Sequence, residues 1–184
     1  MLHGMCDEPE NECAYFAEAV TKSSWLICPR ASQRCNQGGS IWSHSRRFET
    51  VAAAIERVRS EWTGAIDESR GHSLIGFSLG AIVASALTES SQLDLRRVLL
   101  IGAKVSPDPN RLRSGRVERL VLAAGERDMT FGHMRRQTRK LQQAGVSAEF
   151  VSLGKVGHWF PADFTPRLER TLQWLHGSDE WLER

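Results

Sequence analysis

Long apolar runs are absent from this sequence. None of its 184 residues lies in an apolar stretch close to the roughly 18 residues that a membrane-spanning helix needs, so we predict no membrane span. The first residues show no basic segment followed by an apolar one, so we expect no signal peptide and, on that ground alone, a cytoplasmic protein.

Internal repeats, linkers and a strong charge of one sign are also absent. The length and the 41% hydrophobic content predict one domain over residues 1–184. The net charge of +2 points to no particular partner. Nine lysines and arginines gather between residues 111 and 140, but neither interleaved aromatics nor a recognition motif accompanies them. We therefore predict a solvated helix face there and no nucleic-acid binding.

Cysteine is absent after residue 35. Cys6, Cys13, Cys28 and Cys35 form two C-x6-C pairs in the first fifth of the chain. We favour two local disulfides, Cys6–Cys13 and Cys28–Cys35, which is one of three possible pairings and would imply an extracytoplasmic setting. Free buried thiols are the alternative. Zinc sites prefer tighter cysteine spacing, so we predict no metal.

The most informative segment is Gly76-Phe77-Ser78-Leu79-Gly80. A short apolar run precedes it, and a stretch of small residues with helical character follows it. G-x-S-x-G between a strand and a helix is typical of a nucleophile elbow, a sharp turn that holds the serine hydroxyl clear of the sheet. An ordinary glycine-rich turn is the alternative, so the interpretation depends on finding an acid and a histidine further along the chain.

Both follow, each after a predicted strand. Asp128 comes after the strand-like segment 116–124, and His158 comes after the segment 148–153. The order Ser78, Asp128, His158 is the order of the catalytic residues in α/β-hydrolases.

Each of these residues also has a simpler interpretation. Asp128 could cap a helix that begins near Phe131, with Glu126 as the fallback acid, and His158 could be a surface turn residue. The position of each residue directly after a strand favours catalysis.

In these motifs the sequence resembles the α/β-hydrolase superfamily, above all its small lidless carboxylesterases, acyl-protein thioesterases and dienelactone hydrolases. The run Leu2-His3-Gly4-Met5 looks like the oxyanion loop of that family. The resemblance implies that Ser78 is the nucleophile, His158 its base, and Asp128 the residue that orients the imidazole. It implies no cofactor.

The resemblance also implies the supporting residues. The backbone N–H groups of Leu79 and Met5 would form the oxyanion hole, and His3 would hold the oxyanion loop in place. Trp42 and Trp159 are candidates for the substrate pocket, although both could simply be packed aromatics. The implied activity is hydrolysis of short-chain esters or thioesters. The alternatives are a peptidase or perhydrolase on the same scaffold, or a binding or scaffold protein that keeps the fold without catalysis.

Alternating helices and strands predict an α/β fold, a three-layer α/β/α sandwich with a mostly parallel sheet. About 13 residues separate two of the strands where family members with a lid insert it, so we predict an open site. Only Met1 and Leu2 precede the oxyanion loop, so we expect a minimal fold that lacks the N-terminal strands. An exposed sheet edge would follow, which favours a homodimer. We also expect helices from about 11 and 48 and a short strand at 25–28.

Overall fold

The computed structural model describes residues 1–64, 66–89 and 92–177. The helices in these ranges are α1 (Pro9–Val20), α2 (Arg47–Glu61), α3 (Leu79–Thr88), α4 (Pro109–Ser114), α5 (Phe131–Gln143) and α6 (Phe164–His176). The strands are β1 (Gln33–Arg34), β2 (Ser40–Ile41), β3 (His72–Phe77), β4 (Leu95–Ile101), β5 (Arg119–Ala124) and β6 (Ala148–Ser152). The helices of this described part include none with the length and apolar content to cross a membrane.

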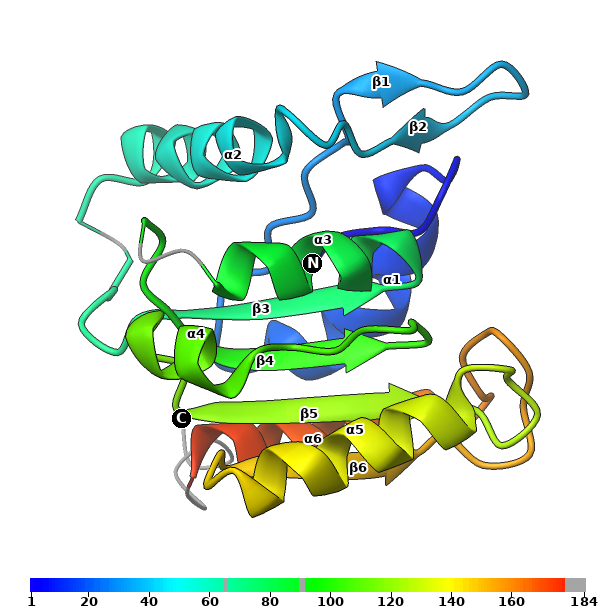
Figure 1. Ribbon diagram of the computed structural model, residues 1–184. Helices are drawn as coiled ribbons and strands as arrows, with labels where there is room; N and C mark the ends of the chain where they lie inside the picture. Colours follow the sequence, from blue (N-terminus) through cyan, green and yellow to red (C-terminus); the bar gives the residue numbers. More distant parts are fainter. Residues whose placement is uncertain (65, 90–91, 178–184) are drawn as a thin grey trace.

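Four strands form one parallel sheet in the order β3-β4-β5-β6, with helices on both faces (Figure 1). On one face α3 packs on β3 and β4, and α5 packs on β5 and β6. On the other face α1 and α6 pack against each other, and α6 contacts β4 and β5. This arrangement confirms the predicted three-layer α/β/α fold class. A separate antiparallel hairpin consists of β1 and β2.

The two central strands are buried on both faces. In β4, Val98 and Leu100 belong to the core on one side of the sheet, and Leu99 and Ile101 belong to the core on the other side. This alternation explains why β4 and β5 read as continuous apolar runs, as is usual in parallel sheets covered by helices. Burying one such side chain contributes roughly 1.5–3 kcal/mol. The buried strands β4 and β5 fix the carboxyl ends of the sheet, where the candidate site lies.

Two glycines bring α3 close to β3. A Cβ atom at Gly76 would lie 2.5 Å from the carbonyl oxygen of Gly80, and a Cβ at Gly80 would overlap the carbonyl of Leu2. Real Cβ atoms are not found at such separations. The turn between β3 and α3 therefore requires the small residues that the elbow motif supplies.

The outer side of β3 is only partly covered. Leu2 forms one bridge there, donating its N–H to Ile75 O at 2.8 Å and accepting from Phe77 N at 3.1 Å. A cavity of about 430 Å³ lies beside the first half of β3, at the end away from Ser78. Its walls include apolar residues of α1, of α2 and of the segment between α1 and β1, among them Val20, Leu26, Val51 and Ile55.

The predicted strand at 25–28 is absent, and this prediction was wrong. A strand needs a neighbour with which to form a ladder, and Leu2 offers β3 a single bridge and no extended strand beyond it. The segment is held instead by the amino group of Met1, which donates to Ile27 O at 2.6 Å. Helix α1 begins at Pro9, two residues before the expected cap at Asn11.

The four cysteines pair as Cys6–Cys35 and Cys13–Cys28, so the predicted pairing was wrong. The equal spacing of the two pairs suggested local bridges. In the structure α1 carries Cys13 away from the loop that holds Cys6 and toward the returning segment with Cys28. Cys35 meets Cys6 because the hairpin of β1 and β2 is hydrogen-bonded to that same loop. Two disulfides favour an oxidising compartment.

Candidate active site

Ser78 occupies the turn between β3 and α3 in a strained backbone conformation. Its φ of 53° and ψ of −120° lie outside the regions that residues other than glycine usually adopt. Such strain costs about 1–3 kcal/mol and persists only where the surroundings enforce it. Here the Ser78 N–H donates to Ile101 O at 2.9 Å, which ties the turn to the end of β4.

Ser78, His158 and Asp128 form one hydrogen-bonded chain. His158 Nε2 lies 2.9 Å from Ser78 Oγ, and His158 Nδ1 lies 2.6 Å from Asp128 Oδ2. A carboxylate only accepts hydrogen bonds, so Nδ1 carries the proton and Nε2 is free to accept from the serine hydroxyl. The structure thus brings together three residues that are up to 80 positions apart in sequence. That is the arrangement in which a serine can be activated by a base.

The surroundings of Asp128 keep its carboxyl ionised. Burial raises the pKa of Asp128, but the N–H of Thr130, at 2.8 Å, and the imidazole of His158 outweigh burial and lower that pKa below its usual value. Asp128 thus makes both of the contacts that its position suggested. Its Oδ1 accepts from Thr130 N–H, directly before α5, and its Oδ2 accepts from the imidazole of His158. The fallback acid Glu126 points elsewhere and accepts from Ser152 Oγ at 3.0 Å.

A glycine that the motifs did not single out makes room for the imidazole. Gly102 follows β4 with a φ of 65°, and a Cβ on it would lie 3.0 Å from Cε1 of His158. The ring of Phe77 also packs against the imidazole, with a centroid distance of 5.0 Å to His158. A glycine directly after a buried strand is the sequence signal that could have revealed this position.

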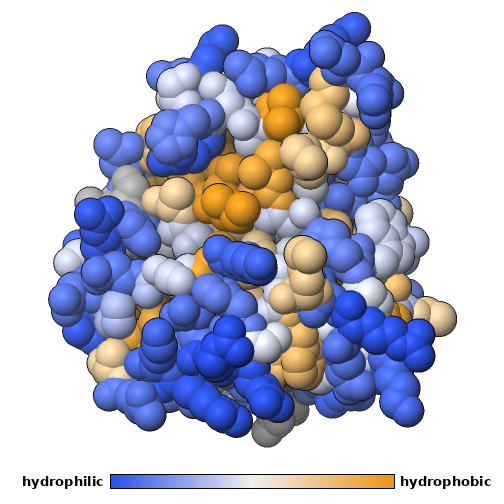
Figure 2. All heavy atoms as spheres, turned by 45° about the vertical axis from the view of Figure 1, so that its right-hand side comes forward, coloured by the Kyte–Doolittle hydropathy of each residue, from blue (hydrophilic) through white to orange (hydrophobic). Residues whose placement is uncertain are grey.

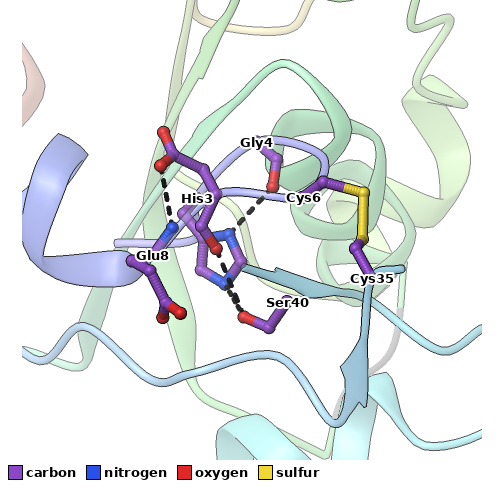
Figure 3. Close-up of a disulfide and its surroundings, with 7 residues drawn as sticks. His3, Gly4, Cys6, Glu8, Cys35 and Ser40 are labelled. Carbon is purple, nitrogen blue, oxygen red and sulfur yellow. Dashed lines mark hydrogen bonds between the residues drawn. A yellow bond between two sulfur atoms is a disulfide. The ribbon is translucent and has the colours of Figure 1, made fainter. Parts of the chain in front are cut away.

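The predicted oxyanion loop is held from several sides (Figure 3). The His3 ring contacts Gly4 O at 2.8 Å through Nδ1, while its Nε2 lies 3.2 Å from both Ala31 N and Ser40 Oγ. Because Ala31 N–H can only donate, Nε2 is the acceptor and Nδ1–H donates to Gly4 O. Burial lowers the pKa of His3, which agrees with a neutral ring. The disulfide Cys6–Cys35 links the loop to the hairpin.

The two expected oxyanion donors have no partner within the described part of the chain. Neither the N–H of Met5 nor that of Leu79 donates a hydrogen bond there. Leu79 begins α3, so its N–H also lies at the positive end of that helix. In a trans peptide the N–H points opposite to the preceding C=O, so the contact between His3 and Gly4 O directs Met5 N–H away from His3.

The two tryptophans that we expected at a substrate pocket differ in exposure. Trp42 is only 6% exposed, and its Nε1 donates to His3 O at 2.8 Å, so it supports the oxyanion loop from beneath. Trp159 is 42% exposed beside His158. Met5, whose N–H is an expected oxyanion donor, and Met129, next in sequence to Asp128, are also exposed, and these two residues and Trp159 are named the apolar rim.

Figure 2 shows the surface on the side of the molecule toward which the strand arrows of Figure 1 point. Apolar side chains gather in the middle of this face, and hydrophilic side chains surround them. Ile82 of α3, about half exposed, lies one helical turn after Ser78.

Comparisons with known proteins agree with this fold. The sequence matches no protein-family model, and no curated protein matches it significantly. The structure is similar to an uncharacterized protein from Bacillus cereus ATCC 10987, with a TM-score of 0.77 and 17% identity, over 94% of this chain and 57% of that one. It is also similar to esterase PE8, with a TM-score of 0.63 and 17% identity, over 95% and 90% of the two chains.

A third similar structure is acyl-protein thioesterase 2 from Zea mays, with a TM-score of 0.58 and 18% identity, over 96% of this chain and 92% of that one. At such identities the likeness shows the fold. This chain therefore has an α/β-hydrolase fold, as its motifs predicted, and its structural neighbours include an esterase and a thioesterase.

Proposed function

We propose that this chain is a serine hydrolase that cleaves carboxylic esters or thioesters with short acyl chains. The observation that supports this best is the hydrogen-bonded order of Ser78, His158 and Asp128 at the carboxyl ends of the strands. A binding protein has no need of that order. The names of two structural neighbours, esterase PE8 and acyl-protein thioesterase 2, point to the same chemistry.

The first half of the reaction forms an acyl-enzyme. Ser78 Oγ attacks the carbonyl carbon of the substrate while its proton passes to His158 Nε2. Asp128 remains ionised and stabilises the imidazolium. The carbonyl oxygen becomes an oxyanion and accepts hydrogen bonds from the N–H groups of Leu79 and Met5. Removing one such donor typically costs about 10²–10³ in rate.

The second half releases the acid. His158 gives its proton to the leaving alcohol or thiol as the tetrahedral intermediate collapses, which leaves the acyl group on Ser78. Water then enters, His158 takes one of its protons, and the hydroxide attacks the acyl carbon. The second tetrahedral intermediate places its oxyanion at the same two N–H groups. When this intermediate collapses, the proton on His158 passes to Ser78 Oγ.

The surroundings of Ser78 support a preference for small acyl groups. The side chains of the apolar rim, Met5, Met129 and Trp159, are exposed. The segment between β4 and β5, where a lid would be inserted, carries only the short helix α4. The apolar rim is therefore open to water, so a long acyl chain would gain less there than in a closed tunnel.

The test is covalent labelling together with turnover. Wild type should react with a fluorophosphonate probe and hydrolyse a short-chain nitrophenyl ester, and Ser78→Ala should do neither. Ser73→Ala, an exposed serine on the same strand, is the matched control and should behave like wild type. No labelling and no turnover above Ser78→Ala would remove the proposal.

A further inference from the structure

A buried carboxyl group that the mechanism above does not use lies behind the oxyanion loop. Glu12 of α1 is 1% exposed. The N–H of Gly4 donates to both of its oxygens, at 2.9 Å to Oε1 and 3.0 Å to Oε2. The N–H of the next residue, Met5, is the proposed oxyanion donor. Glu12 therefore fixes the peptide directly before that donor.

Gly4 is also close to both Glu12 and the nucleophile. A Cβ at Gly4 would lie 2.9 Å from Glu12 Oε1 and 3.4 Å from Ser78 Cβ. The carboxyl and the serine thus both lie next to the side of Gly4 on which a Cβ would stand. Only a few ångströms separate the carboxyl from the place where the oxyanion forms.

The charges around Glu12 favour its neutral form. Burial is the largest cause that raises the pKa of Glu12, and the Asp7 carboxyl raises it further through a hydrogen bond and its charge. The Gly4 N–H acts in the opposite direction, and the resulting pKa is about 8. At neutral pH the Glu12 carboxyl is therefore mostly protonated.

The other ionisable groups nearby leave this balance in place. His3, on the same loop, is kept neutral because burial lowers its pKa. Arg30 pairs with Glu8, directly before α1, and with Glu10 in its first turn. His158 lies beyond Ser78, bonded to the serine and to Asp128.

We propose that Glu12 is a positioning residue for the hydrolysis proposed above, on which this inference rests, and that it supports the reaction only while its carboxyl is protonated. The neutral group accepts from Gly4 N–H and so orients the loop that presents Met5 N–H. The ionised group accepts the same hydrogen bond, but places a negative charge close to the developing oxyanion. Ionisation therefore slows acyl transfer and leaves the shape of the site intact.

The size of the effect follows from Coulomb's law. Two negative charges several ångströms apart at an effective dielectric constant near 20 repel each other enough to slow the reaction by about 10- to 100-fold. The loss should fall on kcat, since the oxyanion exists in the transition state and is absent from the bound ester.

The experiment compares pH profiles. We would measure kcat and KM for a short-chain nitrophenyl ester from about pH 5.5 to about pH 10, in wild type and Glu12→Gln, with Ser78→Ala subtracted. Glu18→Gln, an exposed glutamate on the same helix, is the matched control. Wild type and the control should lose kcat as pH rises through about 8. Glu12→Gln keeps an acceptor for Gly4 N–H without ionising, so its profile should remain flat there.

Two further variants separate charge from geometry. Glu12→Ala removes the acceptor and should have a kcat at least about tenfold below that of Glu12→Gln at every pH, with a thermal melt at each pH to show that it is folded. Asp7→Asn should move the alkaline midpoint to lower pH, since the Asp7 charge raises the pKa of Glu12. An unmoved midpoint in Asp7→Asn would count against the charge argument.

The outcomes distinguish this inference from the proposed function. If Glu12→Gln reacts with fluorophosphonate but shows the same alkaline loss as wild type, the role of Glu12 is overturned and the hydrolase stands. If wild type neither turns over ester nor labels above Ser78→Ala, both fail.

Discussion

At the scale of single residues, Trp42 offers a direct test of how the oxyanion loop is supported. Its indole N–H is bonded to His3 O in a buried setting. Trp42→Phe would keep the ring packing and leave that carbonyl without its donor, which costs about 1–3 kcal/mol. We expect a lower free energy of unfolding and a severalfold lower kcat with little change in KM.

Chemical denaturation and ester turnover measure these two quantities. Trp62→Phe is the control, because Trp62 is half exposed at the end of α2. A Trp42→Phe variant as stable and as active as that control would show that the loop does not depend on this contact.

The residues that sequence could predict are those whose signal is local. Ser78 lies in a five-residue motif, and Asp128 and His158 each follow a strand, so chain order alone indicated them. Glu12 and Trp42 carry no such signal. Both side chains contact the oxyanion loop, Glu12 at Gly4 and Trp42 at His3, and these contacts form only in the folded chain. The spacing of residues in the sequence does not show which polar groups become buried partners.

At the scale of elements, the oxyanion loop and the β1–β2 hairpin form one braced unit. Cys6–Cys35 closes a loop with a sequence separation of 29. In the chain-entropy model such a bridge stabilises the fold by about 3–4 kcal/mol. We expect Cys35→Ser to lower both the melting temperature and ester turnover, because Cys6 follows the proposed donor Met5.

The double variant Cys13→Ser, Cys28→Ser is the informative comparison, since that bridge joins α1 to the segment after it and does not touch the loop. It should lose stability while keeping more of its kcat. Equal loss of turnover in both variants would argue against a specific role for the bridge at Cys6.

Elements with a strong apolar pattern and a paired neighbour were predictable. The start of α2 and the runs that became β5 and β6 were found close to their observed bounds. The segment 25–28 has the same apolar character but lacks a neighbouring strand, so its composition was misleading. The disulfide pairing depends on how the hairpin folds back over the loop, which no local spacing encodes.

At the scale of the whole molecule, the homodimer stays a prediction, because the outer side of β3 is only partly covered. Leu2 bonds to the outward-facing groups of Ile75 and Phe77. Backbone groups alternate in direction along a strand, so Ser73 N–H points to the same open side. Ser73→Pro would remove that donor and leave the pairing with β4 in place.

Sedimentation velocity over a range of concentrations measures the outcome. Wild type and Ser73→Ala should show a dimer that dissociates on dilution, and Ser73→Pro should remain monomeric. A wild type that sediments as a monomer at every concentration would contradict a dimer through this edge.

The apolar rim has a consequence for chemical durability. Met5 is 64% exposed and Met129 is 83% exposed, so peroxide can reach both thioethers. Conversion to sulfoxide would replace soft apolar contacts with strongly polar ones while leaving the hydroxyl, imidazole and carboxylate untouched. Oxidation would then weaken the proposed binding of apolar acyl groups before it slowed the chemical steps. A methionine sulfoxide reductase would restore that binding.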